Sequence, residues 1–495
     1  MRFVWSLFPS LAMSYRVKSI ELYVRETPPG RVAFALGRQG AERAKPTTNP
    51  LGHVRMVIAD DRGNESFGCS ADRLSVRWLD KRPDRTQAVK LKELVSLIES
   101  AAAVYRDAGP FASPFAQWRA AHPTIMKASR AARQEDLTGA FASALMERAM
   151  LDAVARLAGK SMFNMVREDR LGFRPGEIHR ELGTIDFTKV LPARPRTRFA
   201  IRHTVGLADP LTADNLDKKD RAGDGLPETL EEYIRTDGLR YFKVKISGDP
   251  TADVKRLARL WEVVPADEET AITLDANEAY EDLAAFERFV TLLARTQPGL
   301  FDHILYIEQP LPRPLTLEAK TKPAITRLAR LKPLLIDEAD GTVDAYRRAF
   351  DLGYDGASHK NCKGFFKSLL NRALVAHFAK GGRQAFLSGE DLQNLPIVPL
   401  HQDFVSLSIL DLAHCERNGH HYNYGLSFVS PADKASVAAH HRDLYVRRGE
   451  EWFLNIRDGH VECASLQCPG FGVHDEPDWK SMPPMRRWLA GRGTS

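Results

Sequence analysis

The sequence has no long hydrophobic run and no block of charge of one sign. No stretch of 18 or more consecutive apolar residues occurs, so no membrane-spanning helix is expected. Lysine and arginine (70) exceed aspartate and glutamate (64) by only six, and no nucleic-acid-binding motif occurs. Small basic clusters at 194–198 and 485–488 are typical of solvated surface. These absences argue against membrane and nucleic-acid partners.

Cysteine is scarce, and its distribution argues against a disulfide framework. The five cysteines are odd in number, scattered and without a CxxC pair: Cys69, Cys362, Cys415, Cys463 and Cys468. This distribution predicts reduced thiols and a cytoplasmic protein. Residues 1–13 imitate a weak signal peptide, but Ser6, Pro9 and Ser10 interrupt the apolar stretch and no A-x-A site follows. Whether residues 1–13 belong to the mature protein stays open.

The remaining composition is that of a globular protein, and the pattern along the chain divides it into three parts. Residues 14–150 alternate like strands up to about 80, and then show helical periodicity at 87–107 and 138–158, with Thr138 as an expected N-cap. Residues 151–430 contain the alternation of strands and helices that is typical of a barrel, with a first strand near 198 and a weak last strand at 421–428. Residues 431–495 are expected to return to the N-terminal block.

Five short polar segments follow aliphatic runs at a regular spacing. Lys245, Asp275, Glu308, Asp337 and Lys360 are separated by 30, 33, 29 and 23 residues. One strand, one helix and two loops occupy about that length, so the steps predict successive βα units. Parallel strands end at the same edge of a sheet, and in a (β/α) barrel that edge is where the chemistry occurs.

Three of these segments supply carboxylates suited to a metal ion. Asp275, Glu308 and Asp337 are hard oxygen ligands of the kind that Mg²⁺ prefers. Glu338 competes with Asp337 for the third position, but the register of the strand endings TLDA, YIEQ and LIDE favours Asp337. Three acids in succession are poorly explained as helix caps. Asn277 lies on the same face as Asp275 and is expected to support the metal or the substrate.

Lysines flank the predicted metal site on the preceding strand. Lys243 and Lys245 are two residues apart, so both side chains are expected to point into the barrel. Repulsion and burial would depress a lysine pKa, as a general base near neutral pH requires. Ion pairing with the carboxylates, without proton transfer, is the alternative.

These segments together resemble the enolase superfamily, in its mandelate racemase and muconate lactonizing enzyme branch. The resemblance covers residues from about 15 to 480 and rests on ALMERAMLDAVARLAGKSMFNMV, KVKISGD, TLDANEAY, YIEQPL, LIDEAD, HKNCKG and DGHVECASLQCPGFGV in that order. It implies an α/β fold, a (β/α)7β TIM-like barrel with an α+β capping domain formed by the N-terminal segment and the C-terminal tail. It also implies one essential Mg²⁺ and abstraction of a proton alpha to a carboxylate.

The resemblance also implies roles for individual residues. Lys245 would be the base or acid, Lys243 its electrostatic partner, and Lys360 the acid–base group on the opposite face of the substrate. Glu390, at the end of the seventh strand, would contact the substrate; a plain cap of the next helix is the alternative. The sequence departs from the family pattern after Lys360, where a glycine pair is broken, so His359 and Lys363 are rivals for the second role.

The leading hypothesis is therefore a Mg²⁺-dependent lyase or isomerase that acts on a small-molecule carboxylate through an enediolate. Lysines on both faces resemble those of cycloisomerases, succinylbenzoate synthases and epimerases. An acid-sugar dehydratase or racemase of the mandelate racemase type is an alternative, but it needs a His–Asp dyad that LSGED does not offer. A non-catalytic metal-binding barrel is a third reading. The resemblance further implies a homo-oligomer, while the substrate itself depends on the variable segments near 26–52 and 420–430.

Overall fold

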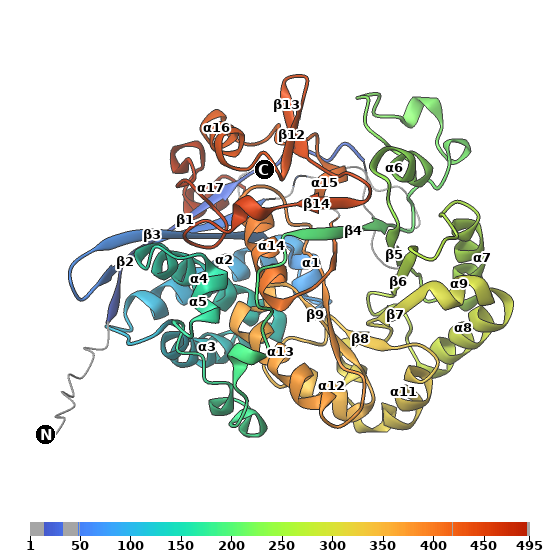
Figure 1. Ribbon diagram of the computed structural model, residues 1–495, viewed down its shortest axis with the longest axis horizontal. Coiled ribbons are helices and arrows are strands. Elements are labelled where there is room, and N and C mark those ends of the chain that lie inside the picture. Colours follow the sequence, from blue (N-terminus) through green and yellow to red (C-terminus); the bar gives the residue numbers. More distant parts are fainter. Residues whose placement is uncertain (1–13, 33–47, 49, 418, 493–495) are drawn as a thin grey trace, which may run out of the picture.

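The computed structural model of the chain describes residues 14–32, 48, 50–417 and 419–492 (Figure 1). The expectation for residues 1–13 and the central part of the specificity segment predicted at 26–52 lie outside the described residues. Within the described ranges, no helix combines the length and the apolar character needed to cross a membrane.

The N-terminal block is an antiparallel sheet covered by helices. Its strands pair in the order β1 (Tyr15–Arg25), β2 (Leu51–Asp60), β3 (Glu65–Arg73). The predicted turn between the last two forms because Asp60 Oδ1 accepts hydrogen bonds from the backbone N–H groups of Arg62 (2.9 Å) and Asn64 (2.8 Å). Four helices follow: α1 (Val76–Leu79), α2 (Gln87–Arg106), α3 (Pro114–Ala131) and α4 (Asp136–Leu157).

Helix α4 joins this block to the rest of the chain. It begins at Asp136 with Glu135 at the N-cap, so the predicted cap at Thr138 is wrong by three positions. The Thr138 hydroxyl instead donates to the backbone oxygen of Leu79. Almost every residue of α4 is buried, because it is enclosed between the sheet and the barrel. Its length crosses position 150, where the sequence had suggested a domain boundary.

The second part of the chain is a closed barrel of eight parallel strands (Figure 1). Pairing of the last strand with the first closes it, in the register of Cys415 with Ile201. The strands are β4 (Arg198–Val205), β5 (Tyr241–Lys245), β6 (Ala271–Asp275), β7 (Ile304–Glu308), β8 (Leu334–Ile336), β9 (Gly356–His359), β10 (Phe386–Gly389) and β11 (His414–Glu416).

Helices separate consecutive strands, which gives the (β/α)7β order expected from the sequence. The principal ones are α6 (Leu230–Asp237), α7 (Pro250–Trp261), α8 (Leu283–Thr296), α11 (Lys322–Ala329), α12 (Ala345–Leu352), α13 (Phe365–Ala379) and α14 (Val398–Leu410). Shorter helices are α5 (Met162–Arg167), α9 (Pro298–His303) and α10 (Arg313–Thr316).

The eighth strand differs from the prediction. It is β11, three residues long, whereas the predicted segment 421–428 begins in the short helix α15 (Gly419–Tyr422) and continues as turns. Three residues are too few to show a period-two pattern, so β11 gave no strand signal in the sequence. This misplacement concealed the last residue of β11, Glu416.

The C-terminal segment contacts both other parts. It contains α16 (Pro431–His440), a hairpin of β12 (Tyr445–Arg448) and β13 (Glu451–Leu454), β14 (His460–Glu462), and α17 (Met485–Gly491). Strand β14 pairs antiparallel with β4 and so extends the barrel sheet. Beyond it, the backbone N–H of Val24 in β1 donates to Pro483 at 3.1 Å, and α17 packs beside β1.

Candidate active site

Three carboxylates lie at the carboxyl ends of consecutive barrel strands. Asp275 is the last residue of β6, Glu308 is the last of β7, and Asp337 directly follows β8. Asp275 is paired in register with Glu308 and, on the other side, with Lys245. All three acids are fully buried. The barrel therefore brings the predicted metal-binding acids to one level inside its mouth.

Lys243 lies among these carboxylates and is fully buried. Its Nζ is 3.0 Å from Asp275 Oδ2, 2.8 Å from Glu308 Oε2 and 3.1 Å from Glu416 Oε2, and it also contacts Glu390. Burial lowers the pKa of Lys243, but the four carboxylates outweigh burial and raise that pKa well above its ordinary value. The expected depression by lysine–lysine repulsion is therefore wrong at Lys243, which is a charge-balancing cation.

Lys245 and Lys360 stand on opposite sides of the acids. They come from the second and sixth strands of an eight-stranded barrel, which are diametrically opposed. Lys245 Nζ lies 2.5 Å from Asp275 Oδ2, and Lys360 Nζ lies 2.8 Å from Asp337 Oδ2. The Lys360 ammonium is also 4.6 Å from the ring centre of Trp78, which α1 contributes from the N-terminal block.

The two neighbouring acids of the fifth strand point to different surroundings. Asp337 accepts a hydrogen bond from Ser358 Oγ at 2.5 Å and contacts Lys360 inside the barrel. Glu338 accepts hydrogen bonds from Trp78 Nε1 (3.1 Å) and Asn277 Nδ2 (3.0 Å), at the face toward the N-terminal block. Burial, followed by the charge of Asp337, raises the pKa of Glu338 to about 7. The geometry therefore separates a barrel acid from a cap-facing acid.

The two rivals of Lys360 have other partners. His359 Nδ1 is 2.7 Å from Ser368 Oγ, and its Nε2 is 3.8 Å from Asp403 Oδ1, so the ring faces helices α13 and α14 outside the barrel. Lys363 Nζ lies 2.7 Å from Asp337 Oδ1 and donates to the backbone oxygen of the same residue at 2.8 Å. Lys363 is thus a buried support for Asp337.

Glu390 does not reach outward as the substrate-contact prediction requires. It is fully buried, forms ion pairs with Arg202 and Lys243, and accepts hydrogen bonds from Ser388 Oγ (2.7 Å) and Tyr306 OH (3.2 Å). Its carboxylate oxygens are therefore occupied by protein donors. Arg202, from a strand that is separated from β10 only by β11, is one of these donors, and a substrate contact by Glu390 stays a prediction.

Asn277 holds the backbone beside Asp275. Its N–H donates to Asp275 Oδ1 at 2.8 Å, and it has a left-handed backbone, with φ of 43°. Asparagine tolerates this conformation better than most residues. Its side chain is committed to Glu338 at 3.0 Å, so Asn277 positions two acids.

Sequence reasoning missed three contributors: Arg202, Glu416 and Trp78. Arg202 and Glu416 come from the first and eighth strands, and Glu416 accepts a hydrogen bond from Thr204 at 2.7 Å. A charged residue within an aliphatic run, as in RFAIRHTV, is the signal that could have identified Arg202. Trp78 gave no such signal, because only the tertiary packing of α1 brings it to Lys360.

The donor set fits a hard divalent cation such as Mg²⁺. Within the described residues Glu308 Oε1 has no hydrogen-bond partner, and Oε2 has only the ion pair with Lys243 at 2.8 Å, although the side chain is fully buried. Burial and the charges of Asp275 and Glu390 raise the pKa of Glu308 well above its ordinary value, so this corner of the site is short of positive charge. Asp275, Glu308 and Asp337 together offer the oxygen-only ligands that Mg²⁺ binds.

Comparison with known proteins agrees with this geometry. Residues 225–362 match the family model described as Enolase C-terminal domain-like. A curated relative, the L-Lys-D/L-Arg epimerase of Methylococcus capsulatus, is 31% identical over 203 residues, which cover 37% of this chain and 52% of the relative. The match thus spans about half the length of that relative.

Solved structures share the whole architecture at low sequence identity. The 2-chloromuconate cycloisomerase of Rhodococcus opacus 1CP superposes with a TM-score of 0.58 at 14% identity, covering 96% of this chain and 99% of that one. A mandelate racemase/muconate lactonizing enzyme from Bordetella bronchiseptica gives 0.58 at 17% identity (94% and 98%). An enolase from Pseudomonas fluorescens Pf0-1, solved with magnesium, potassium and tartrate, gives 0.57 at 14% (97% and 93%).

The family model, the relative and the shared barrel with its N-terminal block lead to one assignment. Residues 225–362 are similar to the Enolase C-terminal domain-like family, and the described chain shares its fold with the mandelate racemase/muconate lactonizing enzymes.

Proposed function

We propose that this protein is a Mg²⁺-dependent lyase or isomerase that removes a proton alpha to a substrate carboxylate through an enediolate. The observation that carries the proposal is the placement of Lys245 and Lys360 on opposed strands, each within 2.8 Å of a carboxylate of the acid trio. Two amines on two sides of one bound substrate can remove a proton from one face and deliver it to the other.

The chain's own residues divide the work. Lys245 removes the alpha proton on its side of the barrel. Lys360 is held as an ammonium, since burial lowers its pKa but Asp337 raises it well above the ordinary value, and an ammonium is the form that donates a proton. Trp78 covers Lys360 from the N-terminal block and keeps water away from it. Lys243 balances the charge of the carboxylates around it.

Asp275, Glu308 and Asp337 would hold the metal ion. Mg²⁺ bound there would supply positive charge against the negative charge that develops on the substrate carboxylate. Support comes from Glu308 Oε1, which has no hydrogen-bond partner among the described residues, and from the magnesium in the Pseudomonas fluorescens structure.

Among the possible outcomes, epimerisation is favoured. It uses both lysines in turn, whereas a syn-eliminating synthase needs one lysine for both proton transfers and the other only for charge. The Methylococcus relative, named for action on L-Lys-D/L-Arg, supports the same choice and makes dipeptides the first candidates. The Pseudomonas fluorescens structure contains tartrate, so small hydroxy acids are also candidate substrates to be tested.

The dehydratase and mandelate racemase alternative finds no support in the barrel interior. Its dyad would need a histidine facing the substrate, and the His–Asp contact near the sixth strand, His359 with Asp403, lies outside the barrel. The His401 ring is also committed elsewhere, to Gly472 (2.9 Å) and Tyr445 (3.0 Å).

Deuterium exchange tests the proposal across several substrate classes at once. N-acyl amino acids, dipeptides including Lys–Arg, and acid sugars would be incubated with enzyme and Mg²⁺ in deuterated water and followed by NMR. We expect deuterium at the alpha carbon of one class, and none with the Lys245→Ala/Lys360→Ala double variant. Exchange that is equal in both proteins, or absent with every probe, would contradict the proposal and favour the non-catalytic barrel.

The setting of the enzyme is also proposed. The cysteines are free thiols, four of them buried, which supports a reducing compartment such as the cytoplasm. We further propose a homo-oligomer that acts on a small-molecule carboxylate. Light scattering of the purified protein tests the oligomeric state.

A further inference from the structure

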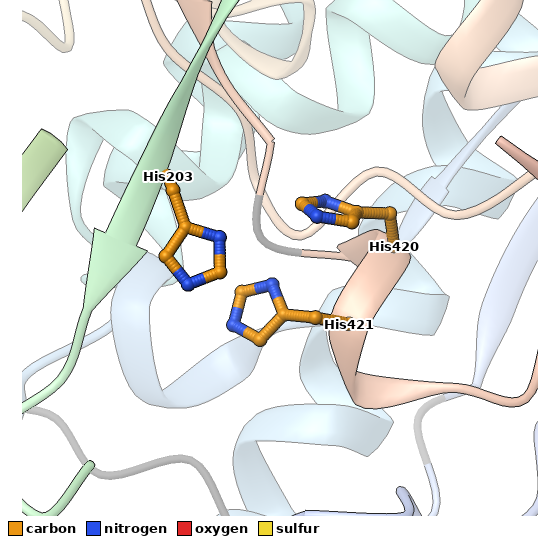
Figure 2. Close-up of side chains that lie close together, drawn as sticks. All are labelled: His203, His420 and His421. Carbon is orange, nitrogen blue, oxygen red and sulfur yellow. The ribbon is translucent and has the colours of Figure 1, made fainter. Parts of the chain in front are cut away.

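Three histidines meet outside the barrel, beside the seam between its first and last strands. His203 lies on β4, and His420 and His421 lie on α15. Its neighbours in β4, Arg202 and Thr204, bond to acids of the barrel interior, so His203 points to the outer face. Figure 2 shows the rings of His203 and His421 facing each other, with His420 beside them. One nitrogen of each ring lies within 4.8 Å of the others.

The rings of His203 and His421 are buried and short of partners. His203 is 3% exposed and His421 is 5% exposed. Nδ1 of His203 and both ring nitrogens of His421 have no hydrogen-bond partner among the described residues. Leaving a buried polar nitrogen unsatisfied destabilises the folded state, so native proteins rarely tolerate several together. The arrangement calls for a group that accepts nitrogen lone pairs.

We propose that His203, His420 and His421 bind a divalent transition-metal ion of the zinc class. Three imidazoles around such an ion, each about 2.0–2.1 Å from it, hold their nitrogens about 3.3 Å apart. The observed ring centres are separated by 4.4, 4.9 and 5.7 Å, so small side-chain rotations suffice. An all-nitrogen set suits zinc, nickel or copper and not Mg²⁺, which prefers oxygen.

The electrostatic setting allows such an ion. A neutral imidazole offers one nitrogen lone pair to a metal ion, so three of them add no charge to the site. Two nearby cations are already neutralised, since Arg417 pairs with Asp403 (2.6 Å) and Arg31 pairs with Asp224 (2.6 Å).

A small cavity beside the rings offers room for a fourth ligand. Its volume is about 30 Å³, enough for a water molecule, and His203 and His421 form part of its wall. Asp209 and Glu228 also line it, so the adjoining surface carries negative charge. A bound water would complete a four-coordinate site, and these acids would offset the charge of the ion.

The site would fasten three segments that are distant in the sequence. His203 belongs to the first strand and α15 follows the last one, while Arg31 from the N-terminal block donates its backbone N–H to Tyr422 at 2.8 Å. The Arg31 side chain also donates to the backbone oxygen of His421 at 3.3 Å. A metal ion here would hold the N-terminal segment and α15 against the barrel, independently of the chemistry inside it.

Metal retention tests the proposal. The full-length protein would be loaded with Zn²⁺ in excess Mg²⁺, which occupies the carboxylate site, then desalted and analysed by mass spectrometry for zinc. We expect one equivalent of zinc in the wild type and at least tenfold less in His203→Asn and His421→Asn. His474→Asn is the matched control, because His440, His474 and Asp475 form an exposed cluster of the same size. It should retain the full equivalent.

Cobalt spectroscopy of the wild-type protein tests the site without any substitution, so its result does not depend on whether the variants fold. Co²⁺ bound by three imidazoles in four-coordinate geometry gives intense visible absorption, which weakens when zinc is added and is absent from an octahedral oxygen site. The partly exposed His420 provides a milder variant, His420→Asn. Wild-type protein that retains no zinc, lacks this absorption, or loses zinc equally in His474→Asn overturns the proposal. Deuterium exchange with Mg²⁺ in the same samples reports on the proposed function separately.

Discussion

Two adjacent residues of the first barrel strand face different surroundings, one inside the barrel and one outside it. Arg202 points inward, where it pairs with the buried Glu390. His203 points outward to a cluster of imidazoles. Five cations and five carboxylates interlock in the interior: Arg202, Lys243, Lys245, Lys360 and Lys363 with Asp275, Glu308, Asp337, Glu390 and Glu416. The outer cluster has no such charge pairing among the described residues.

The difference shows how one strand can serve two kinds of site. Buried charges are stable only when they are paired and hydrogen-bonded, so the interior is an ionic network whose members depend on one another. Buried imidazoles can instead stay neutral, at the expense of unsatisfied nitrogens. The interior therefore suits a hard cation and acid–base chemistry, while the exterior suits a softer ion with a holding role.

The largest effect is expected from breaking the carboxylate trio. Glu308→Gln or Asp275→Asn should abolish activity and weaken Mg²⁺ binding by more than the 10–100-fold that loss of an outer partner costs. Calorimetric titration measures the affinity. Glu287→Gln is the control and should bind Mg²⁺ as the wild type does, because Glu287 is a partly exposed acid of α8 that pairs with Arg327 outside the barrel. Unchanged affinity in both interior variants would remove the metal-site assignment, while the outer cluster would be untouched.

Single variants of Lys245 and Lys360 test whether each lysine transfers a proton on its own face of the substrate. For an epimerase, Lys245→Ala should stop alpha-proton exchange from one enantiomer and Lys360→Ala from the other, each by about 10²–10⁴-fold. Exchange into each pure enantiomer is followed by NMR, with the exposed Lys255→Ala as control. If Lys360→Ala exchanges both enantiomers at the wild-type rate, the two-base assignment fails, and Lys363→Ala becomes the next variant to measure.

A third prediction compares the loss of stability when a buried arginine of β4 is removed with the loss when an exposed arginine of the same strand is removed. Arg202→Met leaves Glu390 without its arginine in a fully buried position and should lower the free energy of unfolding by about 3–5 kcal/mol. Arg198→Met, also on β4, breaks an exposed pair with Glu462 of β14 and should cost less than about 1 kcal/mol. Denaturant unfolding measures both. Equal losses would mean that the interior network is not cooperative.

The smallest effect concerns protonation of the outer cluster. Burial lowers the folded-state pKa of His420 to about 4, below the unfolded value of about 6.5. Stability from this group is therefore fully present above pH 6.5 and is lost as the pH falls toward 4. His420→Asn should remove part of that loss, about 1 kcal/mol, in chelator-containing buffer. Unfolding curves at pH 7 and pH 5 measure it, and parallel losses in both proteins would contradict the expectation.

Much of the fold could be predicted because strand endings carried a spacing signal. Asp275, Glu308 and Asp337 follow aliphatic runs at nearly constant steps, and the barrel turns those steps into spatial neighbours. The roles of these residues stay predictions until the variants are measured. The eighth strand was misplaced, since β11 is three residues long and shows no periodicity, and with it Glu416 was missed.

The electrostatics could not be predicted from local sequence. The sequence places Lys243 beside Lys245, which suggests repulsion, but the fold surrounds Lys243 with carboxylates from four other strands and raises its pKa. Trp78 is a similar case, because nothing local indicates that α1 reaches Lys360. The charge balance of Lys243 and the covering of Lys360 depend on contacts between segments that are far apart in the sequence.

Helix α4 has a consequence for protein engineering. Arg148 in its interior donates to Asp72 of the sheet (2.9 Å) and to Gln402 of the barrel helix α14 (3.1 Å), while Glu147 accepts from the backbone N–H of Phe366 on α13 (2.5 Å). The two halves of the molecule thus share one buried polar network. Chimaeras that join a foreign N-terminal block to this barrel would leave these buried groups without hydrogen-bond partners. New substrate preferences are therefore better sought by changing loops than by exchanging whole domains.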